Sequence, residues 1–466
     1  MPTFLPAQLA AWTGGQWTSL PAVRLCAFHF DTRQLRAGDV FVAIRTEQRD
    51  GHAFVREAQA AGAVAAIVAV ADATLELPQL VVADPLTAWQ TIAREHRRGF
   101  RGPVVGISGS AGKTSTKDLL AILLGGEDSG VLATEGNLNN HLGVPLTLTR
   151  IDPVRHQFAV IEAGISAPGE MSPLAAMIEP DVSLITLIAA AHTEELGGLE
   201  GVAREKSVLP ASTRATGVAI FSHDTAQYSP FRALGVRTMV VERAEVVRPA
   251  GPTPEKVFFA VSQRAEQTSL ALAYGGAAPV TFTCRRVSEG QAQNAVLAIC
   301  AALWLGVSTE LVQARLPRWQ AARLRGEVRR ENGRLLYLDC YNANPASMAD
   351  ALATFTAIAP PAEARLYVIG CMEELGPDGA AYHRALGRSL ALRANDHLLV
   401  IGTHAHDVCA GVLEHGDLTE QLQIVSSIEP MAAAVAEWYG AVFVKGSRRY
   451  QLEKILEVQT SLPFSH

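Results

Sequence analysis

A strand, a loop and a helix are encoded together in the stretch Val104-Val105-Gly106-Ile107-Ser108-Gly109-Ser110-Ala111-Gly112-Lys113-Thr114-Ser115-Thr116. An apolar pair opens it, a glycine-rich loop follows, and a helical run covers residues 117–124. This order is typical of a phosphate-binding loop, in which backbone N–H groups and the positive end of a helix dipole surround phosphate oxygens. The sequence therefore predicts a nucleotide site at Gly109, Ser110, Ala111, Gly112, Lys113, Thr114 and Ser115.

The loop departs from the usual spacing, in which a glycine stands six residues before the lysine. Ile107 occupies that position and Gly106 lies one place earlier, so the pattern reads Gly-x-x-Gly-x-x-Gly-Lys-Thr. We expect Lys113 to reach the terminal phosphates and the Thr114 hydroxyl to hold Mg²⁺. The alternative is an ordinary glycine turn, which would need neither the lysine nor the threonine.

Length and composition indicate a soluble protein of about three domains, because 466 residues exceed what one hydrophobic core supports. The net charge of −6 gives no reason to expect nucleic acid or an anionic membrane as a partner. The first residues lack a signal-peptide pattern, and the longest apolar run, residues 60–71, is too short for membrane insertion. Six scattered cysteines indicate neither disulfides nor zinc. We expect a cytoplasmic monomer.

Alternating strand-like and helix-like runs predict an α/β fold in three parts, with the first boundary at Gly102-Pro103. Basic residues precede that boundary, and such a run is usually a solvated helix face; they are Arg94, Arg97, Arg98 and Arg101. Continuous apolar runs at 158–161 and 182–188 predict a buried parallel sheet in the middle of the chain. The pattern of strands and helices restarts after about Pro317. The predicted domains are residues 1–101, 102–317 and 318–466.

Two polar residues stand at the ends of the central strands. Glu162 follows the run 158–161, and His192 follows the run 182–188. Ligands bind beyond the carboxyl ends of strands in doubly wound sheets, so both side chains are candidates for a metal site beside the phosphate loop. Taken singly, each would be interpreted as a solvated loop carboxylate or a hydrogen-bonded histidine.

Short polar and glycine-containing strings extend this pattern over nearly the whole chain. They are Asp31-Thr32-Arg33, Asp50-Gly51-His52, Gly136-Asn137-Leu138-Asn139-Asn140, Ile161-Glu162-Ala163-Gly164, Ala189-Ala190-Ala191-His192, Gly201-Val202-Ala203-x-x-Lys206, Asp339-x-Tyr341-Asn342-Ala343-Asn344-Pro345, Met372-x-Glu374-Leu375-Gly376 and Val444-Lys445-Gly446-Ser447-Arg448. In these strings the chain resembles the Mur ligases, ATP-dependent enzymes that form amide bonds in peptidoglycan synthesis. It is most similar to the branch that joins D-alanyl-D-alanine to UDP-N-acetylmuramoyl-tripeptide.

The resemblance implies a three-domain Mur ligase architecture with a central P-loop ATPase-type parallel sheet and a C-terminal Rossmann-like domain. It implies that ATP phosphorylates the tripeptide carboxylate and that the amine of D-alanyl-D-alanine attacks the acyl phosphate. The implied catalytic residues are Lys113, Glu162, His192 and Lys206. Two Mg²⁺ ions are implied, with ligands Thr114, Glu162, His192 and a Lys206 carbamylated by CO₂. From the residues alone, Lys206 would be interpreted as a surface lysine.

The resemblance also implies ligand contacts in each domain. Contacts to the UDP-linked substrate are implied for Thr32, Arg33, Asp50, His52, Asn137, Asn139 and Asn140. Contacts to ATP are implied for Asn294, Arg325 and Asp339, and Arg323 is close enough in sequence to compete with Arg325 for its role. Contacts near the acceptor are implied for Tyr341, Asn342 and Asn344, although asparagines beside Pro345 would also suit a turn. Gly290-Gln291 departs from the pair that often helps to hold adenine in the family.

Two other functions stay open. A ligase of the same superfamily could add a different amino acid or make folylpolyglutamate, although the strings at 136–140 and 341–344 argue against it. A nucleotide-binding paralogue without catalysis would be expected to lose some of the catalytic residues. The sequence leaves open whether the tripeptide ends in diaminopimelate or lysine.

Overall fold

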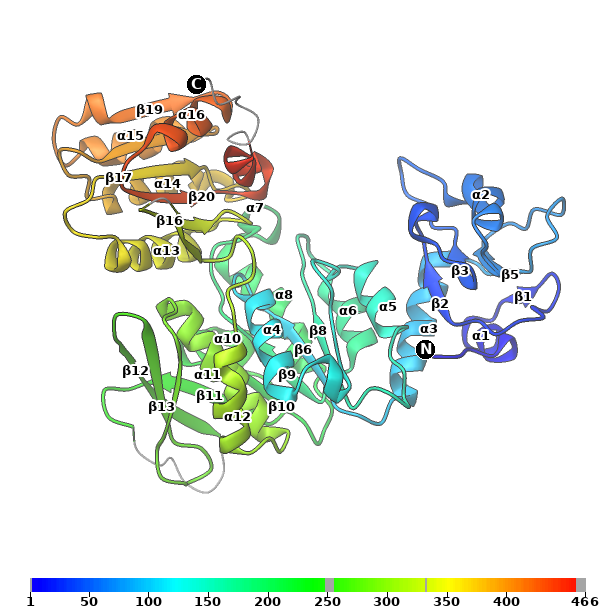
Figure 1. Ribbon diagram of the computed structural model, residues 1–466. Coiled ribbons are helices and arrows are strands. Elements are labelled where there is room, and N and C mark those ends of the chain that lie inside the picture. Colours follow the sequence, from blue (N-terminus) through cyan, green and yellow to red (C-terminus); the bar gives the residue numbers. More distant parts are fainter. Residues whose placement is uncertain (1, 248–254, 332, 458–466) are drawn as a thin grey trace.

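The computed structural model describes residues 2–247, 255–331 and 333–457, and Figure 1 shows three α/β domains in this part of the chain. Each domain is built on a sheet of its own. The first domain stands to one side and is connected to the others through a long helix (Figure 1). The α/β class and the three-part architecture expected from the sequence are confirmed. No helix in the described ranges is long and apolar enough to cross a bilayer.

The first sheet has five strands, and its inner strands are short and mostly buried. Their order is β1 (Gln16–Trp17), β5 (Gln79–Val81), β4 (Ala65–Val68), β3 (Asp39–Val42) and β2 (Ala27–His29). All neighbours are parallel except the edge pair β1–β5. The helices of this domain are α1 (Pro6–Thr13), α2 (Val55–Ala60) and α3 (Pro85–Gly99).

The central sheet has nine strands and contains the phosphate loop. Their order is β14 (Val280–Arg285), β13 (Gln267–Leu272), β12 (Lys256–Gln263), β11 (Thr238–Arg243), β10 (Val218–Ser222), β9 (Val182–Ile185), β6 (Val104–Ser108), β8 (Phe158–Glu162) and β7 (Val131–Ala133). Neighbours from β12 to β7 are parallel, whereas β13 and β14 continue antiparallel. The predicted parallel sheet therefore carries an unpredicted antiparallel extension at one edge.

Helices cover both faces of the central sheet, so its inner strands are apolar on both sides. One face packs on α4 (Lys113–Leu124), α11 (Glu289–Trp304) and α12 (Thr309–Arg315). The other packs on α5 (Gly143–Leu148), α6 (Met171–Ile178) and α8 (Gly198–Ala211). Three shorter helices are α7 (Thr193–Leu196), which comes after β9, and α9 (His223–Ala226) and α10 (Ser229–Arg232), which come one after the other behind β10.

The third sheet has six strands between two layers of helices. Their order is β15 (Glu327–Glu331), β16 (Arg334–Asp339), β20 (Ala441–Lys445), β17 (Arg365–Gly370), β18 (His397–Ile401) and β19 (Leu422–Val425), with only β15 antiparallel. One face packs on α13 (Pro345–Ile358), α14 (Gly379–Ser389) and α15 (Ala405–Leu413). The other packs on α16 (Glu429–Glu437). Such a sheet places its ligands at the carboxyl ends of the parallel strands.

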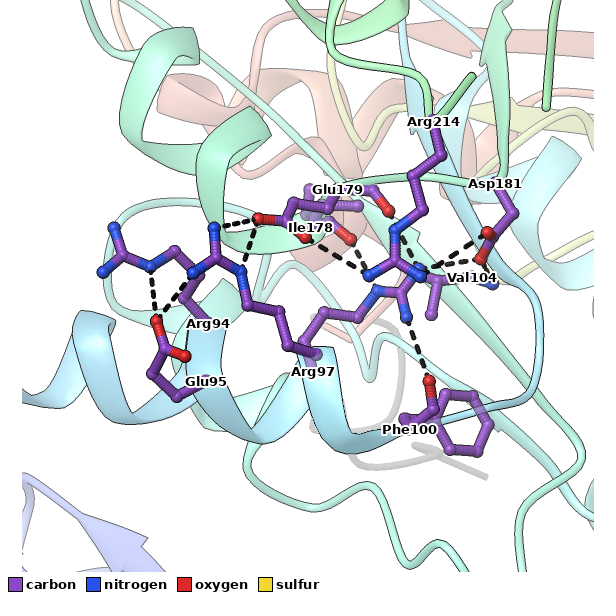
Figure 2. A network of polar contacts seen from close by, with 10 residues as sticks. Arg94, Glu95, Arg97, Phe100, Val104, Ile178, Glu179, Asp181 and Arg214 are labelled. Carbon is purple, nitrogen blue, oxygen red and sulfur yellow. Dashed lines mark hydrogen bonds and ion pairs between the residues drawn. The ribbon is translucent and has the colours of Figure 1, made fainter. Parts of the chain in front are cut away.

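The basic run before the first boundary is solvated at Arg98 and Arg101, but the prediction of a solvated face is wrong for Arg97. Its side chain is fully buried, because it reaches from α3 into the central domain (Figure 2). The guanidinium pairs with Asp181 at 2.7 Å and donates to the carbonyls of Ile178 and Glu179, each at 2.8 Å. Burial lowers the pKa of Arg97 to about 10 although Asp181 opposes this shift, so the group stays charged at neutral pH.

Helix α3 belongs to two hydrophobic cores. Trp89 and Ile92 lie in the core of the first domain, while Ala93 and Phe100 lie in the core that also contains Val104 of β6. Because one helix serves both cores, the first two domains are joined by packing as well as by chain connectivity. The domain limits given above remain predictions.

Candidate active site

Two glycines allow the phosphate loop between β6 and α4 to take its shape. Gly109 has φ 142° and Gly112 has φ 78°, in the region that favours glycine. A Cβ on Gly109 would lie 1.9 Å from Thr186 Oγ1, and one on Gly112 would lie 2.1 Å from Asn294 Nδ2. Helix α4 begins at Lys113, rather than at residue 117, so its first N–H groups point into the loop.

Lys113 folds back onto the loop that precedes it. Its Nζ donates to the Gly109 carbonyl at 2.9 Å. Burial lowers the pKa of Lys113, Glu162 opposes this shift, and Arg325 adds to it. The ammonium thus lies among loop atoms, where it can move to a phosphate oxygen at small cost in desolvation.

Three side chains beside the loop form a hydrogen-bonded array. The Thr114 hydroxyl donates to Glu162 Oε2 at 2.9 Å, and Asn139 Nδ2 donates to Glu162 Oε1 at 2.7 Å. Glu162 ends β8 and is 1% exposed. A buried carboxylate next to a hydroxyl provides the hard oxygen ligands that Mg²⁺ prefers. These residues therefore suit a magnesium ion, as the sequence predicts.

His192 lies at the far side of the same site and contacts another domain. It has φ 56°, and its Nδ1 makes an ion pair with Glu374, which follows β17 in the third domain. Burial lowers the pKa of His192; Glu374 opposes this shift, and Lys206 and Lys113 add to it. The sequence predicted His192 as a site residue but gave no role to Glu374.

Lys206 is buried in α8 and is not the surface lysine of the alternative interpretation. It is 1% exposed, and no hydrogen bond or ion pair joins its Nζ to any residue in the described ranges. Burial lowers its pKa well below the ordinary value for lysine, and the charge on Lys113 adds to this shift. A buried ammonium without a partner is unfavourable, so this nitrogen is expected to be neutral or chemically modified.

A cleft of about 700 Å³ between the central and third domains brings most of the predicted residues together. Those that line it are Ser110, Ala111, Gly112, Lys113, Thr114, Ser115, Asn137, Asn139, Asn140, Glu162, His192, Asn294, Arg325, Asp339, Tyr341, Asn342 and Asn344. Gly109 and Lys206 do not line it, although Lys206 acts electrostatically on His192. One cavity thus holds most of the predicted phosphate, metal and acceptor residues, with Gly109 and Lys206 outside its lining.

The third domain forms the opposite wall of this cleft. The Arg325 guanidinium lies 3.9 Å from the centre of the Tyr341 ring. Asp339 pairs with Lys445 at 2.5 Å, and burial raises the pKa of Asp339 while Lys445 opposes this shift. Asn344 caps α13 and also donates to the Ser110 carbonyl at 3.1 Å, so it connects the third domain directly to the phosphate loop.

The residues predicted to contact uridine diphosphate lie elsewhere, in the first domain. Arg33 is paired with Asp31 at 2.7 Å, and Thr32 donates to Glu57 at 2.5 Å. Asp50 caps a short 3₁₀ helix and contacts His52 Nδ1 at 2.6 Å. None of Thr32, Arg33, Asp50 and His52 lines the cleft. Their contact with a ligand remains a prediction.

Sequence reasoning assigned no role to two further residues that line the cleft, Lys445 and Asp350. Lys445 ends β20, and its string was noticed without a role being assigned. Asp350 of α13 accepts from Ser288 Oγ at 2.5 Å and from the Gly290 N–H at 3.0 Å, across the domain interface. Lys445 could have been identified from the sequence, because a lysine at the end of an apolar strand is a candidate for a charged site residue. Asp350 lies inside an ordinary helical pattern and gave no signal.

Comparison with known proteins places this geometry in a family. Residues 107–302 match the Mur ligase middle domain, and residues 324–448 match the Mur ligase, glutamate ligase domain. The UDP-N-acetylmuramoyl-tripeptide--D-alanyl-D-alanine ligase of Escherichia coli (strain K12) is 30% identical over 441 residues, which cover 93% of each chain. The chain belongs to the Mur ligase family. The enzyme of the same name from Bacillus subtilis (strain 168) is 28% identical over 445 residues, 93% of each chain.

Solved Mur ligase structures share this architecture from end to end. A crystal structure of MurF from Acinetobacter baumannii superposes with a TM-score of 0.85 at 28% identity, covering 99% of this chain and 100% of that one. The MurF ligase of Thermotoga maritima in complex with ADP superposes with a TM-score of 0.78 at 24% identity, covering 92% and 96%, and supports the fold. The resemblance to the Mur ligases is thus confirmed.

Proposed function

We propose that this chain is an ATP-dependent ligase that joins D-alanyl-D-alanine to UDP-N-acetylmuramoyl-tripeptide in peptidoglycan synthesis. The observation that carries the proposal is the single cleft in which the phosphate loop faces the acceptor-side residues of the third domain. ATP, a carboxylate and an amine can meet there, as an acyl-phosphate mechanism requires. Similarity over nearly the full length to enzymes of this name supports the choice of substrates.

The phosphate loop would carry out the phosphoryl-transfer part of the reaction. The N–H groups at the start of α4 and the Lys113 ammonium would hold the β- and γ-phosphates, and Thr114 and Glu162 would hold Mg²⁺. Mg²⁺ supplies positive charge that neutralises the phosphate oxygens during transfer. No group of three His, Cys, Asp or Glu side chains suited to a metal lies in the described residues, so substrate phosphates would complete the ligand set.

Three further residues would hold the rest of ATP. Asn294 Oδ1 is buried beside the loop without a hydrogen-bond partner in the described part of the chain, which suits a donor such as the adenine amino group. Arg325 enters from the third domain and would contact the phosphates, and Asp339 lines the same wall. In the family another pair of residues often helps to hold adenine at the position of Gly290-Gln291. The Asn294 contact would partly replace what that pair provides.

His192 and Lys206 would form a second metal site. A carbamate on Lys206 would replace an unpaired buried nitrogen by anionic oxygens, which bind Mg²⁺ where an ammonium would repel it. The burial of Lys206 and its lack of a hydrogen-bond partner in the described residues support this modification. The resemblance to the Mur ligases also implies a carbamylated lysine at this position.

The UDP end of the substrate would bind the first domain at Thr32, Arg33, Asp50 and His52, with the peptide reaching the cleft past Asn137, Asn139 and Asn140. Arginine suits a diphosphate through its paired donors. We propose a cytoplasmic monomer, since both substrates are water-soluble precursors.

The test is a substrate panel with the full chain, ATP and Mg²⁺. UDP-muramoyl-tripeptides ending in diaminopimelate or lysine are combined with D-alanyl-D-alanine, D-alanyl-D-serine or single amino acids, and phosphate release and product mass are measured. Phosphate release that depends on a D-alanyl dipeptide supports the proposal. Release that depends on another amino acid assigns a different ligase, and ATP binding without turnover in every mixture assigns a paralogue without catalysis.

A matched pair of variants checks the site. Glu162→Gln can still accept from Asn139 through its amide oxygen and donate from its amide nitrogen to the Thr114 hydroxyl, but it removes the charge that would hold Mg²⁺, so turnover should fall by roughly 100-fold, about 3 kcal/mol in the barrier. Glu135→Gln removes an exposed carboxylate that pairs with Arg150 and should leave turnover unchanged. Equal turnover of the two variants would contradict the role of Glu162.

A further inference from the structure

The loop at residues 372–376 of the third domain docks on the start of α7 in the central domain. The Glu374 carboxylate makes an ion pair with His192 Nδ1, and the Glu374 carbonyl accepts from the Glu194 N–H at 3.4 Å. Thr193 Oγ1 donates to the Leu375 carbonyl at 3.3 Å. A residue predicted to face the metal is thus held by a side chain from a different domain.

The backbone is unusual on both sides of this contact. His192 has φ 56° and Glu374 has φ 61°, in the left-handed region that residues with a Cβ seldom occupy. Such conformations persist where the surrounding structure determines them, and they cluster at functional sites. Each of them aims a side chain across the interface between the domains.

The geometry of the pair decides which imidazole nitrogen is free. With Nδ1 directed to the carboxylate, only Nε2 of His192 is left for a ligand. A histidine that binds a metal usually donates its other ring N–H to a carboxylate or carbonyl, which fixes the tautomer and the ring orientation. Here the carboxylate belongs to a domain that the histidine does not share, so the arrangement exists only while the third domain is docked.

We propose that Glu374 is a positioning residue that acts through His192, so that the second metal site forms only when the third domain is docked on the central domain. The inference rests on the proposed function, because that function places a metal at His192. It adds a link between domain docking and metal binding. Two other roles for Glu374 predict different results: it could bind the metal directly, or it could only hold the domains together.

The experiment measures binding of Mn²⁺, a spectroscopic substitute for Mg²⁺, to the full chain with a non-hydrolysable ATP analogue and UDP-muramoyl-tripeptide. Electron paramagnetic resonance counts the bound ions and gives the affinity of the weaker one. The variants are Glu374→Gln, Glu374→Ala, His192→Ala and the double variant His192→Ala with Glu374→Ala. Glu195→Ala is the control, because Glu195 is an exposed carboxylate of the same helix α7. Thermal melting shows that each variant is folded.

A positioning role predicts a graded result. Glu374→Ala should lower the affinity for the second Mn²⁺ ion by about 10- to 100-fold. Glu374→Gln should lower it by less than about 5-fold, because its amide oxygen still accepts from Nδ1–H of His192. When His192 is already replaced by alanine, Glu374→Ala should not lower the affinity for the more weakly bound Mn²⁺ ion any further. Glu195→Ala should bind both ions as the wild type does.

Three results would overturn the inference. If Glu374→Gln loses the second ion as completely as Glu374→Ala does, the carboxylate is a direct ligand. If Glu374→Ala lowers the affinity for the second ion equally in the presence and absence of His192, Glu374 only supports docking of the domains. If Glu374→Ala binds both ions normally, the contact has no role in metal binding. Failure of the wild type to bind a second ion would instead refute the metal site of the proposed function.

Discussion

Lys206 shows how one buried nitrogen can connect folding with chemistry. Lys206 is buried in α8, where burial and the charge of Lys113 disfavour its ammonium while the charge of Glu205 opposes them. Removal of its amine should therefore leave the protein folded. What is lost is the carbamate oxygen that we propose for the second metal.

Lys206→Ala is expected to lower turnover by roughly 100-fold, about 3 kcal/mol, because an anionic ligand disappears from a dry site. Stripping CO₂ from the wild type should lower its activity, and bicarbonate should restore it. A small carboxylate added to the variant should restore part of the turnover. Near wild-type turnover of Lys206→Ala would remove the second-metal role of Lys206, while the Thr114 and Glu162 site could stand.

The buried His383 predicts a dependence of stability on pH. Its Nε2 accepts from the Met372 N–H at 2.9 Å, so the ring is neutral, and Nδ1 contacts the Gly379 carbonyl at 2.6 Å. Burial lowers the pKa of His383 and the His404 charge adds to this shift, while the Gly379 carbonyl and the Asp407 and Glu373 charges oppose it. The neutral form is therefore the one that the fold stabilises.

Because the folded pKa lies below the unfolded value of about 6.5, the unfolded chain binds more protons as the pH falls through that value. The urea midpoint should be constant above about pH 7 and decrease from pH 6.5 toward pH 5. Other buried histidines contribute to the same trend, so the decrease should be smaller in His383→Gln than in the wild type. An identical decrease in both proteins would exclude His383 as a contributor.

Residues whose chemistry follows from a local pattern were predictable. The phosphate loop and Thr114 could be predicted because a strand, a turn and a helix place them together, and Glu162 because the carboxyl ends of parallel strands meet at one edge of a sheet. Glu374 and Asp350 could not, because their partners lie far away in the sequence. Their role depends on how two domains dock, and no local periodicity encodes that.

At the level of elements, α3 is anchored at its C-terminal end by Arg97. The guanidinium satisfies the carbonyls of Ile178 and Glu179 at the C-terminal end of α6. It also pairs with Asp181, which accepts from the Val104 N–H at 2.8 Å (Figure 2). The strand that leads into the phosphate loop is therefore fixed by the same carboxylate as α3.

Arg97→Ala should lower the free energy of unfolding by about 3 kcal/mol, because it leaves carbonyls and part of a carboxylate buried without their partner. Arg94→Ala is the matched control on the same helix; its partly exposed pair with Glu95 should contribute less than about 1 kcal/mol. Urea unfolding of the two variants measures the difference. Similar midpoints would show that the buried network adds no stability.

Elements with uniform burial were easier to predict than elements with mixed burial. Strands β8 and β9 are buried over almost their whole length, and both were predicted within a few residues. The antiparallel strands β12 to β14 alternate buried and part-exposed positions and contain Gln, Ser and Thr. Half-buried strands of this kind resemble loops in composition, which is why the edge of the central sheet was missed.

At the level of the whole molecule, the proposed substrate contacts are divided between two places. The cleft is lined by residues from Ser110 to Lys445, whereas the proposed uridine diphosphate contacts lie in the first domain. A substrate that reaches both would draw the first domain toward the cleft.

We therefore expect small-angle scattering to show a smaller radius of gyration when an ATP analogue and the UDP-substrate are both bound. The ATP analogue alone should produce little change, since the third domain already contacts the phosphate loop through Asn344. Calorimetry should confirm that both ligands are bound. An unchanged radius under those conditions would count against closure as part of the cycle.

The double membership of α3 also limits how this protein can be recombined. A chimera cut at Gly102-Pro103 would give the central domain a foreign helix end in place of Arg97 and Phe100. Exchange of the first domain between relatives therefore has to transfer residues 178–181 with it, or leave α3 in place and join the chains before Pro85. Substitutions in α3 and in residues 178–181 are therefore expected to occur together among relatives.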